Sequence, residues 1–246
     1  MSFHPCYLST WLKKEPGALL VDMERAQLKR VLKPILGDYY IQIGGLPELA
    51  EASPIRFKWF FNTQSKSDAI QVSLDELPLL PHSVDVIALI HVLEFTPEPQ
   101  VLLQEAYQAL VPGGQLIIVC LNPWSLWGLK HRLTHDHDFP WNGHFWSSWR
   151  VKDWLRHLGL RIVNSDTFCF RPPLKKAKWW QRLLWMEAFG SFCFPSLGGF
   201  FLVTAQKRTV GMTPIKEPAW SKKEVINASG LEPTARTASK CQNYKP

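Results

Sequence analysis

The chain of 246 residues is 46% hydrophobic, which is enough apolar content for one large folded domain and argues against intrinsic disorder. The formal net charge of +7 would suit nucleic-acid binding. However, much of this positive charge lies in residues 207–246, which contain eight Lys and Arg and only three Glu. Only +2 remains for the rest of the chain, so we do not expect a nucleic-acid partner. No uninterrupted apolar run approaches the ~18 residues of a membrane-spanning helix, and we expect no secretory signal. The five cysteines are scattered without a C-x-x-C pair, which favours a reducing cytoplasm and argues against a disulfide framework or a zinc site.

The first part of the chain predicts a helix followed by strands. Residues 22–36 have apolar residues at helical spacing, and Asp22 is a candidate N-cap. Residues 39–43 form a short β-prone run that ends at Gly44 and Gly45, which predicts a strand entering a turn. Two further strands are expected, at residues 55–61 and 68–72.

The middle of the chain predicts a buried strand, a helix and a second buried strand. Residues 84–90 are almost wholly apolar, which is typical of a strand covered on both faces in a parallel sheet. Residues 97–110 have helical periodicity. The Pro-Gly-Gly at 112–114 is expected to end this helix and to turn the chain into a strand at 116–121.

The last third predicts helices at 147–159 and 175–189 and strands at 160–163 and 200–205. This alternation of strands and helices predicts a doubly wound α/β fold with a mostly parallel sheet. We expect an N-terminal helical segment at 1–38, the α/β domain at 39–206 with a Trp- and His-rich insertion at 122–147, and a basic extended tail at 207–246.

Several short motifs keep a fixed order and spacing across residues 72–119. They are Leu77-Pro78-Leu79, Ser83-Val84-Asp85-Val86, His91-Val92-Leu93-Glu94, Leu103-Gln104-Glu105-Ala106 and Leu110-Val111-Pro112-Gly113-Gly114. In this order they resemble the type-11 methyltransferase domain of the class I S-adenosylmethionine-dependent methyltransferases. Asn122-Pro123-Trp124-Ser125-Leu126-Trp127-Gly128 also resembles a bacterial subgroup of these proteins, and that likeness extends over most of residues 39–220.

The resemblance implies a seven-stranded, Rossmann-like methyltransferase sheet with an antiparallel last strand. It also implies S-adenosyl-L-methionine as cofactor and methyl transfer to an unidentified small or lipid-like acceptor. The cofactor-binding positions that it implies are Gln42, Gly44, Gly45, Asn62, Ser73, Leu74, Asp75 and His91.

Several of these positions depart from the family pattern. Gln42 stands where the family has an acidic residue, and only Gly44 and its neighbour remain of the G-x-G-x-G turn. Asn62 replaces the carboxylate that would accept hydrogen bonds from both ribose hydroxyls, and Ser73 stands at a usual Asp. A second hypothesis therefore stays open, a non-catalytic interaction protein with a methyltransferase fold and a degenerate cofactor loop.

The candidate catalytic residues are His91 and Asn122. Displacement at a sulfonium methyl needs the two reactants held in line, and sometimes a proton acceptor, but no enzyme nucleophile. His91 follows the strand at 84–90, at the edge where ligands bind open α/β sheets, so it could contact the cofactor, accept a proton, or simply cap the strand. Asn122 follows the next strand and could orient the acceptor, whereas we expect a structural role for Glu94.

Two stretches have unusual side chains. One loop holds six His and Asp residues, and we expect no metal there because no pair fits a zinc template. These residues are His131, His135, Asp136, His137, Asp138 and His144. The Trp-rich segments 124–149 and 179–185 could form an apolar lid, and Trp179, Trp180, Leu183, Leu184 and Phe189 could rest on a membrane surface beside Lys175, Lys176, Lys178 and Arg182. Packing of these aromatics into the core is the simpler hypothesis.

Overall fold

The computed structural model describes residues 17–62, 70–133, 143–172, 182–183 and 185–208. The chain divides into two units, Met1–Val210 and Gly211–Pro246, and every described residue belongs to the first. Among the described residues, no helix has both the length and the apolar character needed to cross a membrane.

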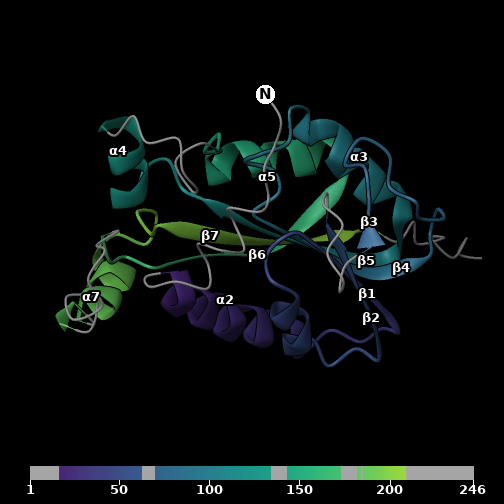
Figure 1. Cartoon of the computed structure of the whole chain (residues 1–246), viewed down its shortest axis with the longest axis horizontal. Helices are drawn as coiled ribbons and strands as arrows, with labels where there is room; N and C mark the ends of the chain where they lie inside the picture. The colour runs from purple at the N-terminus through teal and green to yellow at the C-terminus, as the bar shows by residue number, and fades with distance from the viewer. Residues whose placement is uncertain (1–16, 63–69, 134–142, 173–181, 184, 209–246) are drawn as a thin grey trace, which may run out of the picture. The chain divides into compact units, whose positions relative to one another are not determined.

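The described residues build one seven-stranded sheet in the order β3-β2-β1-β4-β5-β7-β6 (Figure 1). The strands are β1 (Tyr39–Ile43), β2 (Phe57–Asn62), β3 (Ile70–Gln71), β4 (Val84–Ile90), β5 (Leu110–Leu121), β6 (Leu160–Phe168) and β7 (Phe200–Lys207). The pairs from β3 to β5 are parallel, and β7 is antiparallel to both of its neighbours. The predicted doubly wound, mostly parallel sheet with an antiparallel last strand is therefore confirmed.

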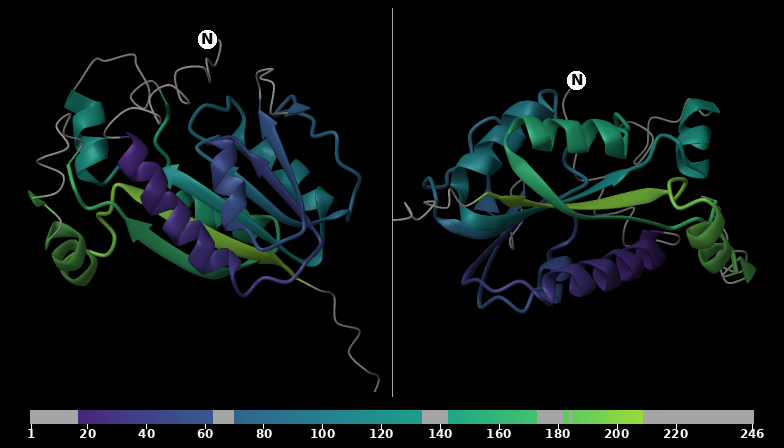
Figure 2. Two further views of the ribbon diagram at one scale, coloured as in Figure 1. Left: turned by 60° about the horizontal axis from the view of Figure 1, so that its bottom comes forward. Right: turned by 180° about the vertical axis from the view of Figure 1, so that it is seen from behind.

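Helices cover both faces of this sheet, which explains why its central strands are apolar without alternation. Helix α2 (Gly17–Leu32) lies on one face, and α3 (Pro99–Ala109) and α5 (Ser148–His157) lie on the other (Figures 1 and 2). The side chains of β4 point alternately into a core beneath α2 and a core beneath α3 and α5. Two shorter helices, α4 (Leu126–Leu133) and α7 (Trp185–Cys193), complete the described elements.

Helix α2 begins five residues before the position that the sequence predicted. Asp22 therefore lies inside the helix, and the prediction that it caps the helix is wrong. The helix ends at Leu32 and not at residue 36, because Pro34 lacks the backbone N–H that a further helical turn requires.

The turn predicted at Pro112–Gly114 is part of strand β5. The strand already starts at Leu110, which pairs with Val84, while the next pair joins Gln115 to Val86. The extra residues of β5 are absorbed in a bulge, and Gly113 has the positive φ of 86° that such an irregularity favours. The Pro-Gly-Gly at 112–114 predicts a turn between two elements, whereas in the structure it lies within a continuous, irregular strand.

The connection from β1 to β2 is unusually short. It contains only a 3-10 helix, η1 (Pro47–Ala52), where doubly wound sheets usually place a full crossover helix. Leu49 is fully buried against the core under α2, so this short segment still closes that face of the sheet.

Strand β7 ends at Lys207, which is the first residue of the predicted tail. The ammonium of Lys207 is buried, donates to the carbonyls of Tyr107 and Leu110 at 2.6 and 2.7 Å, and lies 4.3 Å from the centre of the Tyr107 ring. Burial lowers the pKa of this lysine. The end of β7 is thus fixed to the junction between α3 and β5.

Candidate functional site

The register of the sheet brings several predicted site residues to one edge. Ile43 pairs with both Phe61 and Leu89, and Ile90 pairs with Val119, so the strands β1, β2, β4 and β5 end close together. The residues at or just beyond these ends are Gly44, Gly45, Asn62, His91 and Asn122. This carboxyl edge is where open α/β sheets bind their ligands.

The turn after β1 requires glycine at both positions. Gly44 and Gly45 have φ values of 75° and 70°, a region that other residues rarely adopt. A Cβ on Gly44 would lie 2.5 Å from the carbonyl oxygen of Ile90, and a Cβ on Gly45 would lie 2.9 Å from the side chain of the same residue. Both glycines are therefore needed for the turn to pack against the end of β4.

The side chain of Gln42 supports this turn through hydrogen bonds to its backbone. Its side chain is completely buried, and its Nε2 donates to the carbonyl oxygens of Gly44 at 2.9 Å and Leu46 at 2.8 Å. The hydroxyl of Tyr40 donates to Oε1 of Gln42 at 3.4 Å. Both amide hydrogens of Gln42 are used inside the protein, so the geometry makes this residue a support of the turn.

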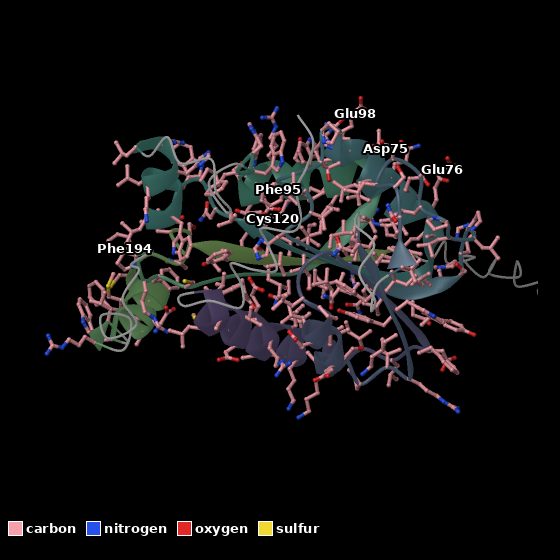
Figure 3. The ribbon with its side chains drawn as sticks, viewed as in Figure 1. Asp75, Glu76, Phe95, Glu98, Cys120 and Phe194 are labelled. Carbon is pink, nitrogen blue, oxygen red and sulfur yellow. The ribbon has the colours of Figure 1, made fainter. Side chains whose placement is uncertain are left out.

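The positions expected to bind adenosine differ in exposure. Asn62 is half-buried at the end of β2, and its carbonyl oxygen accepts a hydrogen bond from the N–H of Val72 at 2.9 Å. Beyond β3, Leu74 is buried in the core, whereas Ser73 and Asp75 are exposed. Figure 3 labels Asp75 on this connection, beside Glu76. Alternation along the connection thus leaves two polar side chains outside and one apolar side chain inside.

His91 lies at the centre of a buried charged cluster. Its Nε2 donates to Glu24 Oε1 at 2.7 Å and its Nδ1 donates to Glu94 Oε1 at 3.1 Å, with all three side chains inaccessible to solvent. The backbone of His91 is left-handed, with a φ of 52°. Its N–H donates to the carbonyl oxygen of Val119 and so continues the hydrogen bonds between β4 and β5. The cluster connects helix α2 to the ends of β4 and β5.

The two carboxylates keep His91 protonated. Burial by itself would lower the pKa of this imidazole, but the charges and hydrogen bonds of Glu24 and Glu94 outweigh burial and raise the pKa to about 10. An imidazolium that donates from both nitrogens has no lone pair with which to accept a proton. The geometry therefore gives His91 a structural role. It caps the end of β4, as one of the hypotheses from the sequence has it, and it also connects this strand to α2.

Glu94 also supports strand β5. The same Oε1 atom accepts the N–H of Leu121 at 2.8 Å, and Thr96 beside it donates to the carbonyl of Val92. Burial, followed by the proximity of Glu94, raises the pKa of the Cys120 thiol well above its usual range. Cys120 and Phe95 are labelled in Figure 3. The structural role expected for Glu94 agrees with these contacts.

Asn122 connects the end of β5 to the loop that precedes β7. Its Nδ2 donates to the carbonyl oxygens of Ser196 at 2.8 Å and Gly198 at 2.9 Å. Its Oδ1 accepts the N–H of Trp124 at 3.1 Å, which shapes the turn into α4. Since both donors serve the backbone, the amide of Asn122 stabilises this edge of the sheet.

Sequence patterns could not identify Glu24 as part of the site. It lies 67 residues before His91, on an amphipathic helix where a glutamate is usually solvated. The available signal was its position on the apolar face of α2, between Val21 and Leu28, both of which are buried.

The His- and Asp-rich loop is described only at its ends. His131 stacks on Phe145 with ring centres 4.3 Å apart, and His144 packs against Trp146. Within the described residues no group of three or more His, Cys, Asp or Glu is arranged to hold a metal ion. His135, Asp136, His137 and Asp138 lie outside the described residues, as do Lys175, Lys176, Lys178, Trp179, Trp180 and Leu184.

Comparison with known families gives one match. Residues 53–118 match the model of a methyltransferase domain. The type-11 domain expected from the sequence motifs is thereby supported over these residues, which include β2, β3, β4 and α3.

Known proteins and structures extend this likeness to most of the chain. It is 28% identical to the uncharacterized protein YafS of Escherichia coli strain K12 over 205 residues, which cover 78% of this chain and 80% of YafS. A SAM-dependent methyltransferase from Thermotoga maritima superposes with a TM-score of 0.60 and 18% identity, covering 83% of this chain and 98% of that one. A second, from Mesorhizobium loti, gives a TM-score of 0.52 and 17% identity, covering 75% and 98% of the two chains.

The structural likenesses show the fold and nothing beyond it. The cyclase SpnF also superposes, with a TM-score of 0.53 and 15% identity, covering 76% of this chain and 81% of that one. The domain match covers residues 53–118, and the rest of the sheet has the fold of these methyltransferases. Asn62 lies at the end of β2, and the exposed Ser73 and Asp75 lie on the connection that follows β3.

Proposed function

We propose that this chain is a methyltransferase that moves the methyl group of S-adenosylmethionine to a small or lipid-like acceptor. The observation that carries the proposal is the glycine turn at the carboxyl end of β1, within the strand order β3-β2-β1-β4-β5-β7-β6. The adjoining edge offers the amide of Asn62 and the exposed Ser73 and Asp75.

In this proposal the cofactor supplies an electrophilic methyl group, and the protein holds the cofactor and the acceptor in line. The glycine turn lets backbone approach the cofactor closely. Asn62 binds the ribose, with one hydrogen bond accepted and one donated, and Ser73, Leu74 and Asp75 lie along the adenine. No protein nucleophile is needed, since the acceptor itself attacks the methyl group.

His91 and Asn122 act in this proposal as positioning residues. The imidazolium of His91 fixes the ends of β4 and β5 to α2, and Asn122 fixes the loop before β7. Both residues thereby shape the edge on which an acceptor would lie. A proton acceptor, where the acceptor chemistry needs one, is then supplied by another group or by water.

The competing hypothesis is a non-catalytic interaction protein, and two observations favour it. The amide of Gln42 donates to the turn itself, where the family uses an acidic residue. The helix after the turn is reduced to η1, which is too short to offer the N-terminal N–H groups of a full helix to a ligand.

Titration calorimetry with S-adenosylmethionine and S-adenosylhomocysteine separates the two hypotheses. We expect saturable binding of both ligands, tightened about tenfold by Asn62→Asp because a carboxylate accepts hydrogen bonds from both ribose hydroxyls. Asp75→Ala should weaken binding about tenfold, while the neighbouring exposed acid in the control Glu76→Ala should leave it unchanged.

Absence of heat and of any thermal shift with either ligand at millimolar concentration would reject the methyltransferase proposal. Equal losses from Asp75→Ala and Glu76→Ala would reject the assignment of the adenine edge.

A further inference from the structure

Helices α4 and α7 lie at the same end of the sheet, on opposite sides of the end of β7 (Figures 1 and 2). Both helices and the loops beside them carry large apolar side chains that are exposed. The exposed fraction reaches 88% for Phe192 and 73% for Leu133. We name the set the α4–α7 surface. It consists of Trp124, Leu126, Leu129, Leu133, Trp185, Phe189, Phe192, Phe194 and Leu197. Scattered apolar residues are ordinary on a protein surface, but so many large ones at one end of the molecule mark a contact site.

Helix α7 is attached to the protein by its polar and small residues, and its aromatic residues face outward. Glu187 accepts a hydrogen bond from Nε of Arg171 at 2.9 Å, and its second oxygen accepts the N–H of Phe170. Gly190 packs so closely that a Cβ there would lie 2.4 Å from the Phe170 ring. This orientation is the reverse of the usual amphipathic helix of a globular protein.

Helix α4 is anchored in a comparable way. Trp127 is fully buried, and its Nε1 donates to the carbonyl of Arg171 at 2.9 Å. A Cβ on Gly128 would lie 2.1 Å from the carbonyl oxygen of Pro123, so this residue also holds the helix close to the preceding turn. Leu126, Leu129 and Leu133 are left outside. Both helices therefore present apolar side chains while fixed in place.

The charges around this surface are positive. Residues 122–133 contain Lys130 and Arg132 and no acidic residue, and residues 182–197 contain Arg182 and one acid, Glu187, which is paired with Arg171. The guanidinium of Arg132 lies 5.3 Å from the centre of the Trp124 ring. Tryptophan and leucine flanked by cations suit the boundary between headgroups and acyl chains of an anionic bilayer.

The surface also contains a hollow beside α7, to which α4 contributes Leu126. It has a volume of about 270 Å³ and an almost wholly apolar lining, which includes Leu126, Phe170, Trp185 and Phe194. Figure 3 labels Phe194 at this end of the molecule, well away from Asp75. A hollow of this chemistry suits an acyl chain better than a polar peptide.

We propose that the α4–α7 surface docks this protein on anionic lipid bilayers, with its aromatic side chains in the acyl-chain boundary and its cations among the headgroups. The docking surface is adjacent to the carboxyl end of β5, because α4 follows that strand after a short turn. Docking requires neither cofactor nor methyl transfer, so this proposal can be tested independently of the proposed activity.

Flotation of the full chain with vesicles tests this proposal without added cofactor. We expect binding to phosphatidylglycerol-containing vesicles, weakened by salt and far weaker with pure phosphatidylcholine. Phe192→Ser should lower vesicle affinity about tenfold, because one aromatic side chain no longer enters the bilayer. The control Trp149→Ser removes an aromatic residue that is 69% exposed on α5, and it should leave binding unchanged.

A second matched pair tests the role of charge. Arg132→Gln should weaken binding to the anionic vesicles, whereas Arg150→Gln, which removes an arginine stacked on Trp146 and Trp154, should not. Failure to bind vesicles, equal binding to neutral vesicles, or an unchanged affinity of Phe192→Ser would overturn the proposal. A concentration-dependent dimer in sedimentation experiments that Phe192→Ser dissociates would overturn it as well, because a second copy would then cover this surface.

Discussion

Replacing His91 by Asn should cost about 3–5 kcal/mol of unfolding free energy at pH 6.5, because Glu24 and Glu94 would remain buried without their cation. Both contacts are short, 2.7 and 3.1 Å, and all three side chains are inaccessible to solvent. Asn is the conservative choice, because it tolerates the left-handed backbone of this position, with its φ of 52°. The loss would therefore report the imidazolium and not strain in the backbone.

The pH dependence gives a sharper test. The pKa of His91 is raised from 6.5 to about 10 in the folded protein, so its contribution is complete below pH 6.5 and is lost as the pH rises through 10. The free energy of unfolding of the native protein should therefore fall by up to ~1.4 kcal/mol per pH unit from this group across the window. Urea unfolding at pH 6.5, 8 and 9.5, followed by circular dichroism, measures this fall.

The control is His157→Asn, which changes a histidine whose side chain is 77% exposed on α5. Its effect should stay within about 0.5 kcal/mol at each pH. A free energy of unfolding of the native protein that is the same at pH 6.5 and 9.5 would refute the protonated state. A loss no larger than that of His157→Asn would refute the importance of the cluster.

Three further substitutions probe the carboxyl edge by urea unfolding. Gln42→Glu should destabilise the protein by about 3 kcal/mol and weaken S-adenosylhomocysteine binding in calorimetry, because a carboxylate would face two carbonyl oxygens of the turn that now accept hydrogen bonds. Gly44→Ala should cost about 3 kcal/mol, since its Cβ would lie 2.5 Å from the carbonyl oxygen of Ile90 at a positive φ. Asn122→Ala should cost about 2 kcal/mol, since two carbonyls of the loop before β7 would lose their donor.

Matched controls separate these causes from general sensitivity. Gly159→Ala adds a Cβ at a φ of 83° with nothing within 4 Å, so it measures backbone strain without collision and should cost about 1 kcal/mol. Gln104→Glu on the exposed side of α3 should be nearly neutral. If Gly44→Ala proved no worse than Gly159→Ala, the contact with Ile90 would not be limiting. A stable, tightly binding Gln42→Glu variant would contradict the donor role of Gln42.

The sheet was predictable because its central strands are almost wholly apolar. Tyr39–Ile43 and Val84–Ile90 were expected at the positions where β1 and β4 are found, since burial on both faces leaves no ambiguity in the pattern. Strand β6 is longer than predicted, to Phe168, because its later residues are partly exposed and polar and gave no strand pattern. Helix α4 was not predicted, since its eight residues are too few for periodicity to indicate a helix.

The candidate site was predictable in place but not in detail. Strand ends locate Gly44, His91 and Asn122 from the sequence alone, because parallel strands end at one edge. The partners of these residues depend on long-range contacts, such as that of His91 with Glu24, and no local pattern specifies them. The roles of Gln42 and Asn62 toward a cofactor stay predictions.

Lys207 determines where the chain can be shortened. Its ammonium donates hydrogen bonds to carbonyls at the start of β5 and the end of α3. It thereby connects the end of β7 to residues about a hundred positions earlier in the chain. A stop codon after Gln206 should lower the melting temperature by several degrees relative to one after Arg208, about what the loss of 1–2 kcal/mol implies. A shortened version of the chain should therefore keep Lys207, and affinity tags are best attached after this residue.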